Sequence, residues 1–281
     1  MKFNEINIRD PFILLHNDKY YMYGTRGWSS SGFDVYVSED LEDWSEAKSV
    51  FEKPADFWGT KEYWAPEVHE YKGKFYMFAT FHSEDRRRGT HILVSDTPDG
   101  TFVPHSNEPI TPADWEALDG TLYISKDGTP YMVFCHEWLQ VKDGTMCAIK
   151  LKDDLSAPIG EPFVLFSASE YPNANTDTEN FVTDGPFLYR AKNGRLLMLW
   201  STIAHNAYAE AICYSDNGEI DGNWIQCKEP LFDKDGGHGM IFTAKDGKLN
   251  FIMHSPNKPK FAERPVLKEI YETEDGFLKL K

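Results

Sequence analysis

The amino-acid sequence predicts an all-β fold, a five-bladed β-propeller made of four-stranded antiparallel blades. Three observations predict it. A turn signal followed by a short apolar run recurs five times, about every 55 residues. The apolar runs are continuous rather than alternating, which is typical of strands buried on both faces. No segment shows a sustained helical period, and glycine and proline interrupt the chain throughout. Short strands repeated at this spacing are typical of propeller blades.

The first two strands of each blade are expected on either side of a tight turn. Asp-Gly and Asn-Gly pairs adopt the positive φ that hairpin turns need, and Asp127-Gly128 and Asn193-Gly194 are examples. Apolar stretches precede the turns at 12–15, 68–71, 122–124, 187–189 and 240–242. The buried runs that follow them are 20–23, 75–78, 131–134, 196–200 and 249–253.

The outer strands are less regular in the sequence. A third strand-like segment follows each of the first four buried runs, as at 34–38 and 91–95, and a fourth often follows, as at 47–51. The fifth repeat leaves no room for a full blade before Lys281 unless residues 4–8 supply the missing strand and close the ring. The alternative is an irregular β-sandwich with coincidental spacing. Since no linker or low-complexity stretch is present, we expect one domain over residues 1–281.

Composition excludes several classes of partner. The chain has 29 Lys and Arg against 45 Asp and Glu, and its net charge of -16 repels nucleic acid. No apolar run approaches the length of a membrane span, so we expect no membrane partner. The four cysteines form no Cys-x-x-Cys pair, and we expect free thiols. The first residues lack a signal-peptide core, which favours a cytoplasmic location, or a secreted or periplasmic one if a leader has been removed. The sequence says nothing of the oligomeric state.

A polar residue beside glycine or proline stands at the start of the first strand in every repeat. In chain order these residues are Asp10, Glu67, Asp119, Asp184 and His238. The first strand of each blade lines the axis of a propeller, so the five side chains should surround one mouth of the channel. Carboxylates held close together have pKa values that spread apart, which provides the proton donor and the base that glycosidic cleavage requires. The alternative is that these side chains cap strands or bind water.

Further side chains are expected around this mouth. The second strands end at Arg26, His82, His136, His205 and His254. We expect the histidines His82, His136 and His254 to contact sugar hydroxyls, with local hydrogen bonding in loops as the alternative. Trp64 and Trp138 are expected to stack on a sugar ring. The Arg86-Arg87-Arg88 run follows Glu84-Asp85 and is expected to be a solvated rim.

These motifs, taken in order over the whole chain, resemble those of glycoside hydrolase family 43, a family of five-bladed propellers. The motifs are Arg9-Asp10-Pro11, Trp64-Ala65-Pro66-Glu67, Leu118-Asp119-Gly120, Asp184-Gly185-Pro186-Phe187, Gly237-His238-Gly239, and the closing segments 254–257 and 263–265. The resemblance implies that Asp10 is the general base, that Asp184 is the general acid and that Asp119 tunes and orients the acid. It also implies an axial His238, beside a calcium or other cation, and a role for Arg264 in binding a carboxylate or hydroxyl.

One motif departs from the family. The resembled pattern has Glu where this chain has Asp184, which is one methylene shorter. Glu179, five residues upstream, is the alternative acid, and loss of activity is a further alternative. We expect Asp184 to serve, because an aspartic acid keeps the same chemistry.

The resemblance implies a single-displacement, inverting hydrolase that requires no cofactor. Inversion predicts that Asp10 and Asp184 are about 6.5–9.5 Å apart. The expected substrates are oligosaccharide fragments of plant polysaccharides, cleaved by exo action, and the leading activities are α-L-arabinofuranosidase and β-xylosidase. The alternatives are an endo-arabinanase, a β-galactosidase or galactanase of the same family, or a propeller that binds sugar without cleaving it.

Overall fold

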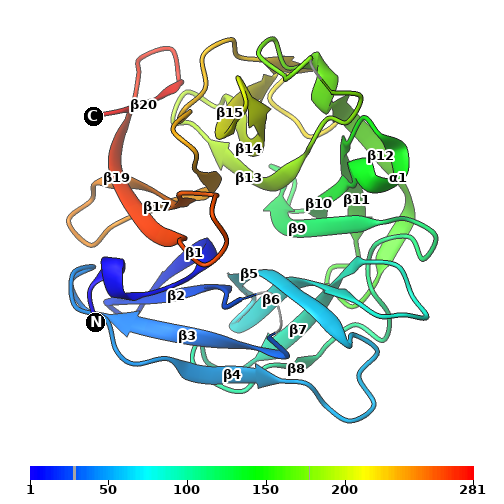
Figure 1. Ribbon diagram of the computed structural model, residues 1–281, viewed down its shortest axis with the longest axis vertical. Coiled ribbons are helices and arrows are strands. Elements are labelled where there is room, and N and C mark those ends of the chain that lie inside the picture. The colour runs from blue at the N-terminus through cyan, green and yellow to red at the C-terminus, as the bar shows by residue number, and fades with distance from the viewer. Residues whose placement is uncertain (28–29, 177) are drawn as a thin grey trace.

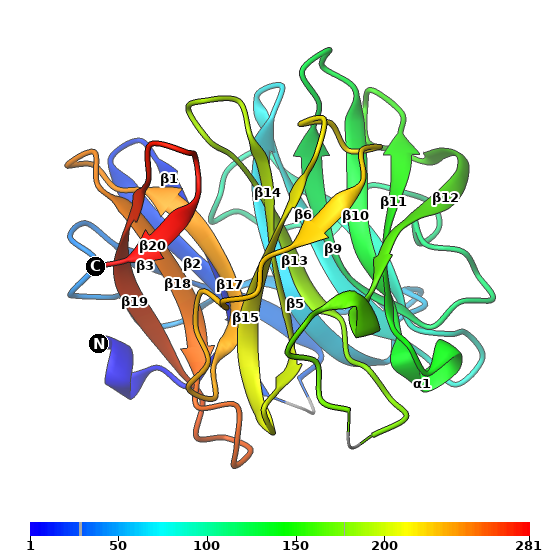
Figure 2. The same cartoon turned by 90° about the horizontal axis from the view of Figure 1, so that it is seen from above.

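The computed structural model has five four-stranded sheets arranged around one axis (Figure 1). It describes residues 1–27, 30–176 and 178–281. In each sheet the strands follow one another in chain order, and every neighbouring pair is antiparallel. Figure 2 shows the sheets as separate twisted units standing side by side. The predicted all-β, five-bladed propeller is confirmed.

Each blade begins with its innermost strand. The first blade contains β1 (Arg9–His16), β2 (Lys19–Thr25), β3 (Gly32–Ser38) and β4 (Lys48–Glu52), and the second contains β5 (Lys61–Tyr71), β6 (Lys74–His82), β7 (Gly89–Ser95) and β8 (Val103–Pro104). The third contains β9 (Ala117–Ile124), β10 (Pro130–His136), β11 (Thr145–Leu151) and β12 (Pro158–Ser167), and the fourth contains β13 (Asp184–Arg190), β14 (Leu196–Ala204), β15 (Ala207–Ser215) and β16 (Trp224–Gln226). The fifth contains β17 (Gly237–Thr243), β18 (Leu249–Ser255), β19 (Arg264–Glu272) and β20 (Leu278–Leu280). The described helical segments are η1 (Phe3–Glu5), α1 (Trp138–Val141) and η2 (Ala168–Glu170).

The second strands are buried on both faces, as their continuous apolar runs predict. Met22, Met77, Met132 and Met198 are each fully buried in the middle of the second strand of their blade. The turns before them have the expected left-handed backbone, with φ of 86° at Gly128 and 92° at Gly194. Apolar clusters fill the space between neighbouring blades. This packing fixes the position of each inner strand relative to the next.

The fifth blade differs from the prediction. It is complete within its own residues, from β17 to β20, and residues 4–8 contribute no strand to it. The reason is that the outermost strand is only three residues long and pairs with β19 through the short turn at 273–277. Residues Phe3–Glu5 form the 3₁₀ turn η1 instead.

Side chains therefore join the first and last blades. The Asn7 amide donates to the carbonyls of Phe261 and Glu263 at 2.9 and 2.8 Å. Arg9 Nη1 donates to the buried Glu263 carboxylate at 3.0 Å, and its Nη2 donates to Asn257 Oδ1 at 3.0 Å. Arg264 Nε donates to the Asn4 carbonyl at 2.9 Å. The two ends of the chain are thus held by contacts between residues more than two hundred positions apart.

All four cysteines are free thiols, and Cys135, Cys147 and Cys213 are buried. Among the described residues, no helix has both the length and the apolar character that crossing a membrane demands.

Candidate active site

The inner strand of every blade carries the same β-bulge. Two of its residues stand opposite a single residue of the second strand, and the pairs are 10–11, 65–66, 119–120, 185–186 and 238–239. The first residue of each pair has positive φ: 53° at Asp10, 45° at Ala65, 58° at Asp119, 49° at Gly185 and 51° at His238. A left-handed residue re-aims the strand locally, and for a non-glycine residue this conformation costs about 1 kcal/mol or more.

The bulges define which residues are equivalent around the axis. Asp10, Asp119 and His238 occupy the same position in their blades, as the sequence motifs predict. In the second blade, however, this position belongs to Ala65, and Glu67 lies two residues deeper, at the position of Thr121 in the third blade. In the fourth blade it belongs to Gly185, so Asp184 lies one residue before the bulge. The predicted ring of five equivalent polar residues is wrong at these two places. The number of residues between an apolar run and the bulge of the preceding strand does not reveal the strand register, which decides which residues are equivalent.

Hydrogen bonds join each bulge to the preceding blade. At four of the five junctions the N–H of the left-handed residue donates to a side chain on the second strand of the preceding blade. The accepting residue is the one that pairs with the inner-strand residue immediately before the bulge of that preceding blade. The donors and acceptors are Ala65 N to Thr25 Oγ1 at 2.8 Å, Asp119 N to Thr80 Oγ1 at 2.9 Å, His238 N to Ser201 Oγ at 2.6 Å, and Asp10 N to His254 Nδ1 at 3.2 Å. At the fifth junction Gly185 N donates to Asp119 Oδ2 instead, at 3.0 Å.

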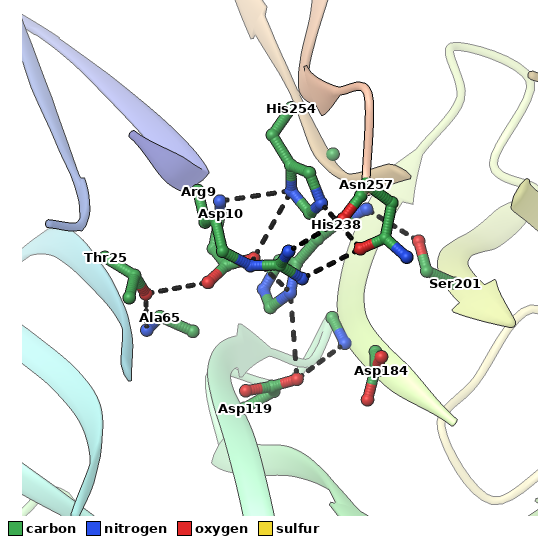
Figure 3. A network of polar contacts seen from close by, with 12 residues as sticks. Arg9, Asp10, Thr25, Ala65, Asp119, Asp184, Ser201, His238, His254 and Asn257 are labelled. Carbon is green, nitrogen blue, oxygen red and sulfur yellow. Dashed lines mark hydrogen bonds and ion pairs between the residues drawn. The ribbon is translucent and has the colours of Figure 1, made fainter. Parts of the chain in front are cut away.

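These bulges aim three carboxyl groups and one imidazole into one cavity of about 320 Å³. Asp10, Asp119, Asp184 and His238 all line it, although they come from four different blades (Figure 3). The other lining residues are Arg9, Thr25, Trp64, Arg88, Leu118, Glu137, Trp138, Leu139 and Tyr208. Titratable side chains gathered in one concave, partly apolar site are typical of an active site.

Asp10 is held as a carboxylate. Its Oδ2 accepts a hydrogen bond from Thr25 Oγ1 at 2.7 Å, and its Oδ1 lies 3.2 Å from His238 Nδ1. Burial raises the pKa of this group, but the positive charges of His238 and Arg9 outweigh it and lower the pKa to about 2. Asp10 is therefore ionised at neutral pH and able to accept a proton from water.

Asp119 and Asp184 show the opposite behaviour. Burial, together with the charges of Asp184 and Asp10, raises the pKa of Asp119 to about 7, against the attraction of His238. Burial also raises the pKa of Asp184, while Tyr208, whose hydroxyl donates to Asp184 Oδ2 at 3.1 Å, opposes that rise. Both carboxyls therefore retain a proton to higher pH than a free aspartic acid does. The expectation that Asp119 stays ionised stays a prediction, because a pKa of about 7 leaves both of its forms populated at neutral pH.

His238 lies between the carboxylates. Its Nδ1 is 3.2 Å from Asp10 Oδ1 and 3.7 Å from Asp119 Oδ2. Burial lowers its pKa, but the three aspartates raise it to about 9 overall, so the ring is an imidazolium. The described residues contain no cluster of three or more metal-binding side chains. This donor set does not fit a metal ligated by several protein groups, and we derive no step through a cation. A cation beside His238 stays a prediction of the resemblance.

One wall of the cavity consists of a buried charged cluster. Arg88 is 6% exposed, and its guanidinium lies 4.8 Å from the centre of the Trp64 ring. It is hydrogen-bonded to Glu137 and, at 2.8 Å, to Glu62 Oε2. The solvated rim expected for the Arg86-Arg87-Arg88 run is therefore wrong for Arg88. Its two acidic partners compensate for its charge, which makes burial possible.

The other predicted residues differ in their positions. Trp64 and Trp138 line the cavity, whereas Glu67, His82, His136, His254 and Arg264 do not. Glu67 accepts from Thr121 Oγ1 at 2.5 Å and lies 3.1 Å from His69 Nε2, deeper along the axis. His254 is fully buried behind Asp10. Glu179, the alternative acid, is an exposed residue whose carboxylate is 3.8 Å from Lys142.

The remaining three predicted residues have local partners. His82 Nδ1 is 2.9 Å from Glu62 Oε2. His136 stacks on Trp115 with ring centres 4.0 Å apart, and its Nε2 is 2.9 Å from Gln140 Oε1. Arg264 Nε donates to the Asn4 carbonyl, and its Nη1 donates to the carbonyl of Phe261. Local hydrogen bonding, the alternative stated for the histidines, describes His82 and His136.

Sequence reasoning missed Tyr208, Arg88 and Thr25. Tyr208 is the second residue of β15, after the two-residue turn at 205–206, and carries no motif that would distinguish it from the other tyrosines of the chain. For Thr25 the sequence does offer an indication, because this residue directly precedes Arg26, which marks the end of the second strand of its blade.

The chain is similar to known proteins in sequence and in fold. The model of the family "Glycosyl hydrolases family 43" matches residues 4–278. The crystal structure of an endo-arabinase from Bacteroides thetaiotaomicron is 40% identical, with a TM-score of 0.93 and 99% of both chains covered. The extracellular endo-alpha-(1->5)-L-arabinanase 1 of Bacillus subtilis is 26% identical over 60% of this chain and 53% of its own. The xylosidase/arabinosidase 43A of Humicola insolens is 26% identical over 46% of this chain and 43% of its own. The chain thus spans about half the length of these two curated relatives.

Proposed function

The chain belongs to glycosyl hydrolases family 43, and from that membership we propose that it is an inverting glycosidase that cleaves α-L-arabinofuranosyl linkages in plant polysaccharide fragments. The observation that carries the proposal is the spread of pKa values in one cavity. Asp10, with a pKa of about 2, faces Asp119 and Asp184, whose pKa values are raised. An ionised base thus faces carboxyl groups that retain a proton more readily than free aspartic acid, which is the pairing that acid-base catalysis requires.

The proposed mechanism assigns one role to each carboxyl. Asp10 removes a proton from a water molecule as that water attacks the anomeric carbon. Asp184 donates its proton to the departing glycosidic oxygen, and Asp119 keeps the acid protonated and oriented. The imidazolium of His238 keeps Asp10 ionised and in place. General acid and base assistance of this kind contributes about 10²- to 10⁴-fold each to the rate.

Arabinofuranoside is the proposed sugar because arabinan-directed relatives recur among the matches. The 40%-identical crystal structure is named an endo-arabinase, and the curated relatives include arabinanases and arabinofuranosidases. β-Xylosidase remains the second sugar, since two relatives carry the name xylosidase/arabinosidase. Release of aryl-α-L-arabinofuranoside, aryl-β-xyloside and aryl-β-galactoside by the wild type and by Asp10→Asn decides between them. Binding of sugar without any release would favour the non-catalytic alternative.

We propose exo action from the size of the site. A cavity of about 320 Å³ is at the small end of the range for ligand sites, which suits a terminal sugar better than an internal stretch of polymer. Endo action is the second candidate, favoured by the name of the 40%-identical structure. Products from linear arabinan separate the two, because exo action releases one product size from the start and endo action releases a range of oligosaccharides. The anomer formed first, observed by proton NMR, tests inversion.

The site of action in the cell follows from the substrate. Two of the relatives are named extracellular enzymes, and the comparisons give no support to the expected cytoplasmic location. We therefore favour a secreted or periplasmic protein that meets polysaccharide fragments directly. Fractionation of cells that express the native gene, followed by detection of the protein, tests this.

A further inference from the structure

One junction in the ring of blade-to-blade hydrogen bonds lacks a good acceptor. At four junctions the acceptor is Thr25, Thr80, Ser201 or His254, each paired with the residue just before its own blade's bulge. The equivalent residue of the third blade is Cys135, which pairs with Leu118. A thiol is a weak hydrogen-bond acceptor compared with a hydroxyl or an imidazole nitrogen. This is also the junction at which the bulge N–H bonds elsewhere.

Cys135 lies next to the proposed catalytic carboxyls. Its side chain is fully buried. Burial raises the pKa of the thiol well above its usual value, and the neighbouring charges of Asp119 and Asp184 add to this effect, whereas the side chain of Thr183 opposes it. The thiol is therefore neutral, and its sulfur is 3.9 Å from the Met146 sulfur, which is itself a poor partner. A neutral, weakly interacting side chain thus fills the place where the other blades have a strong acceptor.

The freed donor goes to a carboxylate. Gly185 N donates to Asp119 Oδ2 at 3.0 Å. Because Gly185 directly follows Asp184, this bond ties Asp119 to the backbone of the proposed acid. A hydrogen bond to a charged acceptor is about twice as strong as one between neutral groups, so it orients the carboxylate firmly. No side chain can be added at Gly185, since a Cβ would lie 2.6 Å from the His238 ring.

We propose that Cys135 is a positioning residue for Asp119. Because the thiol does not accept the Gly185 N–H, this N–H donates to the Asp119 carboxylate instead and orients it. A hydroxyl at this position would accept the N–H, as Ser201 does for His238 one blade further on. The inference rests on the proposed role of Asp119 in catalysis. It goes beyond that role by assigning the orientation of the carboxylate to a side chain that contacts no substrate.

The test compares Cys135→Ser with Cys135→Ala. The serine variant differs from the wild type by one atom and supplies the acceptor found at the other junctions. Losing one charged hydrogen bond at Asp119 is expected to lower kcat about tenfold with KM within about twofold, because the bond acts on the reacting groups rather than on sugar binding. The alanine variant offers no acceptor and should keep more of the wild-type kcat than the serine variant does. Cys147→Ser, the same change at another buried cysteine, is the control for burying a hydroxyl and should leave kcat unchanged.

A structural measurement decides the matter independently of activity. In the Cys135→Ser variant a crystal structure should show Gly185 N bonded to the new hydroxyl, and the Gly185 amide proton should shift in the NMR spectrum. In Cys135→Ala the same amide signal should stay close to its wild-type position. This measurement still tests the inference if the serine variant does not fold. If the wild type hydrolyses no glycoside, the proposed function fails while this readout still stands. Gly185 N remaining on Asp119 in the serine variant overturns the inference, as does an equal loss of kcat in serine and alanine variants.

Discussion

Asp10 owes its low pKa to two particular neighbours, His238 and Arg9. The neutral Asp10→Asn variant keeps the size of the side chain and its contact with Thr25, but it accepts no proton. We expect kcat/KM on an aryl arabinofuranoside to fall about 10²- to 10⁴-fold, which is the usual contribution of a general base. Initial-rate kinetics measure this. Asp233→Asn, at an exposed position outside the cavity, is the matched control, and an equal loss in both variants would contradict the assignment.

The proposed acid is tested by the leaving group. Asp184→Asn removes the proton that the departing oxygen needs, so we expect a large loss of kcat with a poor leaving group such as an alkyl alcohol. With a good leaving group such as dinitrophenol, little protonation is needed and the loss should be small. Glu179→Gln should match the wild type on both substrates, because Glu179 is exposed and outside the cavity. A variant of Glu179 that selectively lost the poor leaving group would transfer the role of acid to it.

The motifs predict four titratable side chains of the cavity, and the physical reason is local. Glycine or proline stands beside each of them, at or next to the bulge of the inner strand, and that composition is visible in the sequence: Asp10, Asp119, Asp184 and His238. Tyr208 and Arg88 reach the cavity through the register of β15 and through burial against Trp64. Neither the register nor the burial leaves a pattern in neighbouring residues, so neither side chain was predictable.

At the scale of the strand, the bulge of β17 depends on a buried carboxyl. Glu210 on β15 is fully buried, and its Oε2 accepts hydrogen bonds from Ser201 Oγ at 2.7 Å and from Gly239 N at 3.1 Å. Ser201 in turn accepts the His238 N–H. This chain of contacts holds the bulge that aims His238 at Asp10. Burial raises the pKa of Glu210 to about 8, against the lowering effect of its hydrogen-bond donors.

That raised pKa predicts a pH dependence of stability. Between the ordinary value of 4.5 and about 8, the folded protein retains a proton that the unfolded chain has released. The contribution of Glu210 to stability therefore falls as pH rises through this interval. We expect the Tm of Glu210→Gln to decline less than that of the wild type between pH 5 and pH 8, as measured by circular dichroism. Glu229→Gln, at an exposed position, should keep the wild-type slope, and parallel curves for all three proteins would refute the prediction.

The inner strands also show what sequence patterns leave out at this scale. Repeating apolar runs give the order and number of strands, because burial on both faces demands continuous apolar residues. The bulges are set by hydrogen bonds between blades that are distant in sequence, such as Asp119 N to Thr80 Oγ1. The sequence pattern consequently predicts that Glu67 is the second blade's member of the ring, whereas the strand register assigns the bulge position to Ala65.

Across the whole molecule, Glu263 is the central contact between the first and fifth blades. It is 2% exposed and pairs with Arg9 at 3.0 Å. Glu263→Gln removes one of the two carboxylates that the structure describes beside the partly buried Arg9 guanidinium and leaves Asp10, at 4.0 Å. This loss should lower the free energy of unfolding by about 2 kcal/mol. Urea denaturation measures the change. Glu269→Gln removes an exposed pair with Lys281 and should cost less than about 1 kcal/mol, so equal effects of the two substitutions would contradict this role.

The seam between the first and last blades has a mechanical consequence. Among the described residues, no strand is shared across it, so every sheet is built from one continuous stretch of chain. A force applied to the two termini would pull Asn7, Arg9 and Arg264 away from their partners before it reached the backbone ladder of either adjoining sheet. The ring should therefore open between the first and last blades, with each blade intact, at a force below the one that separates two paired strands.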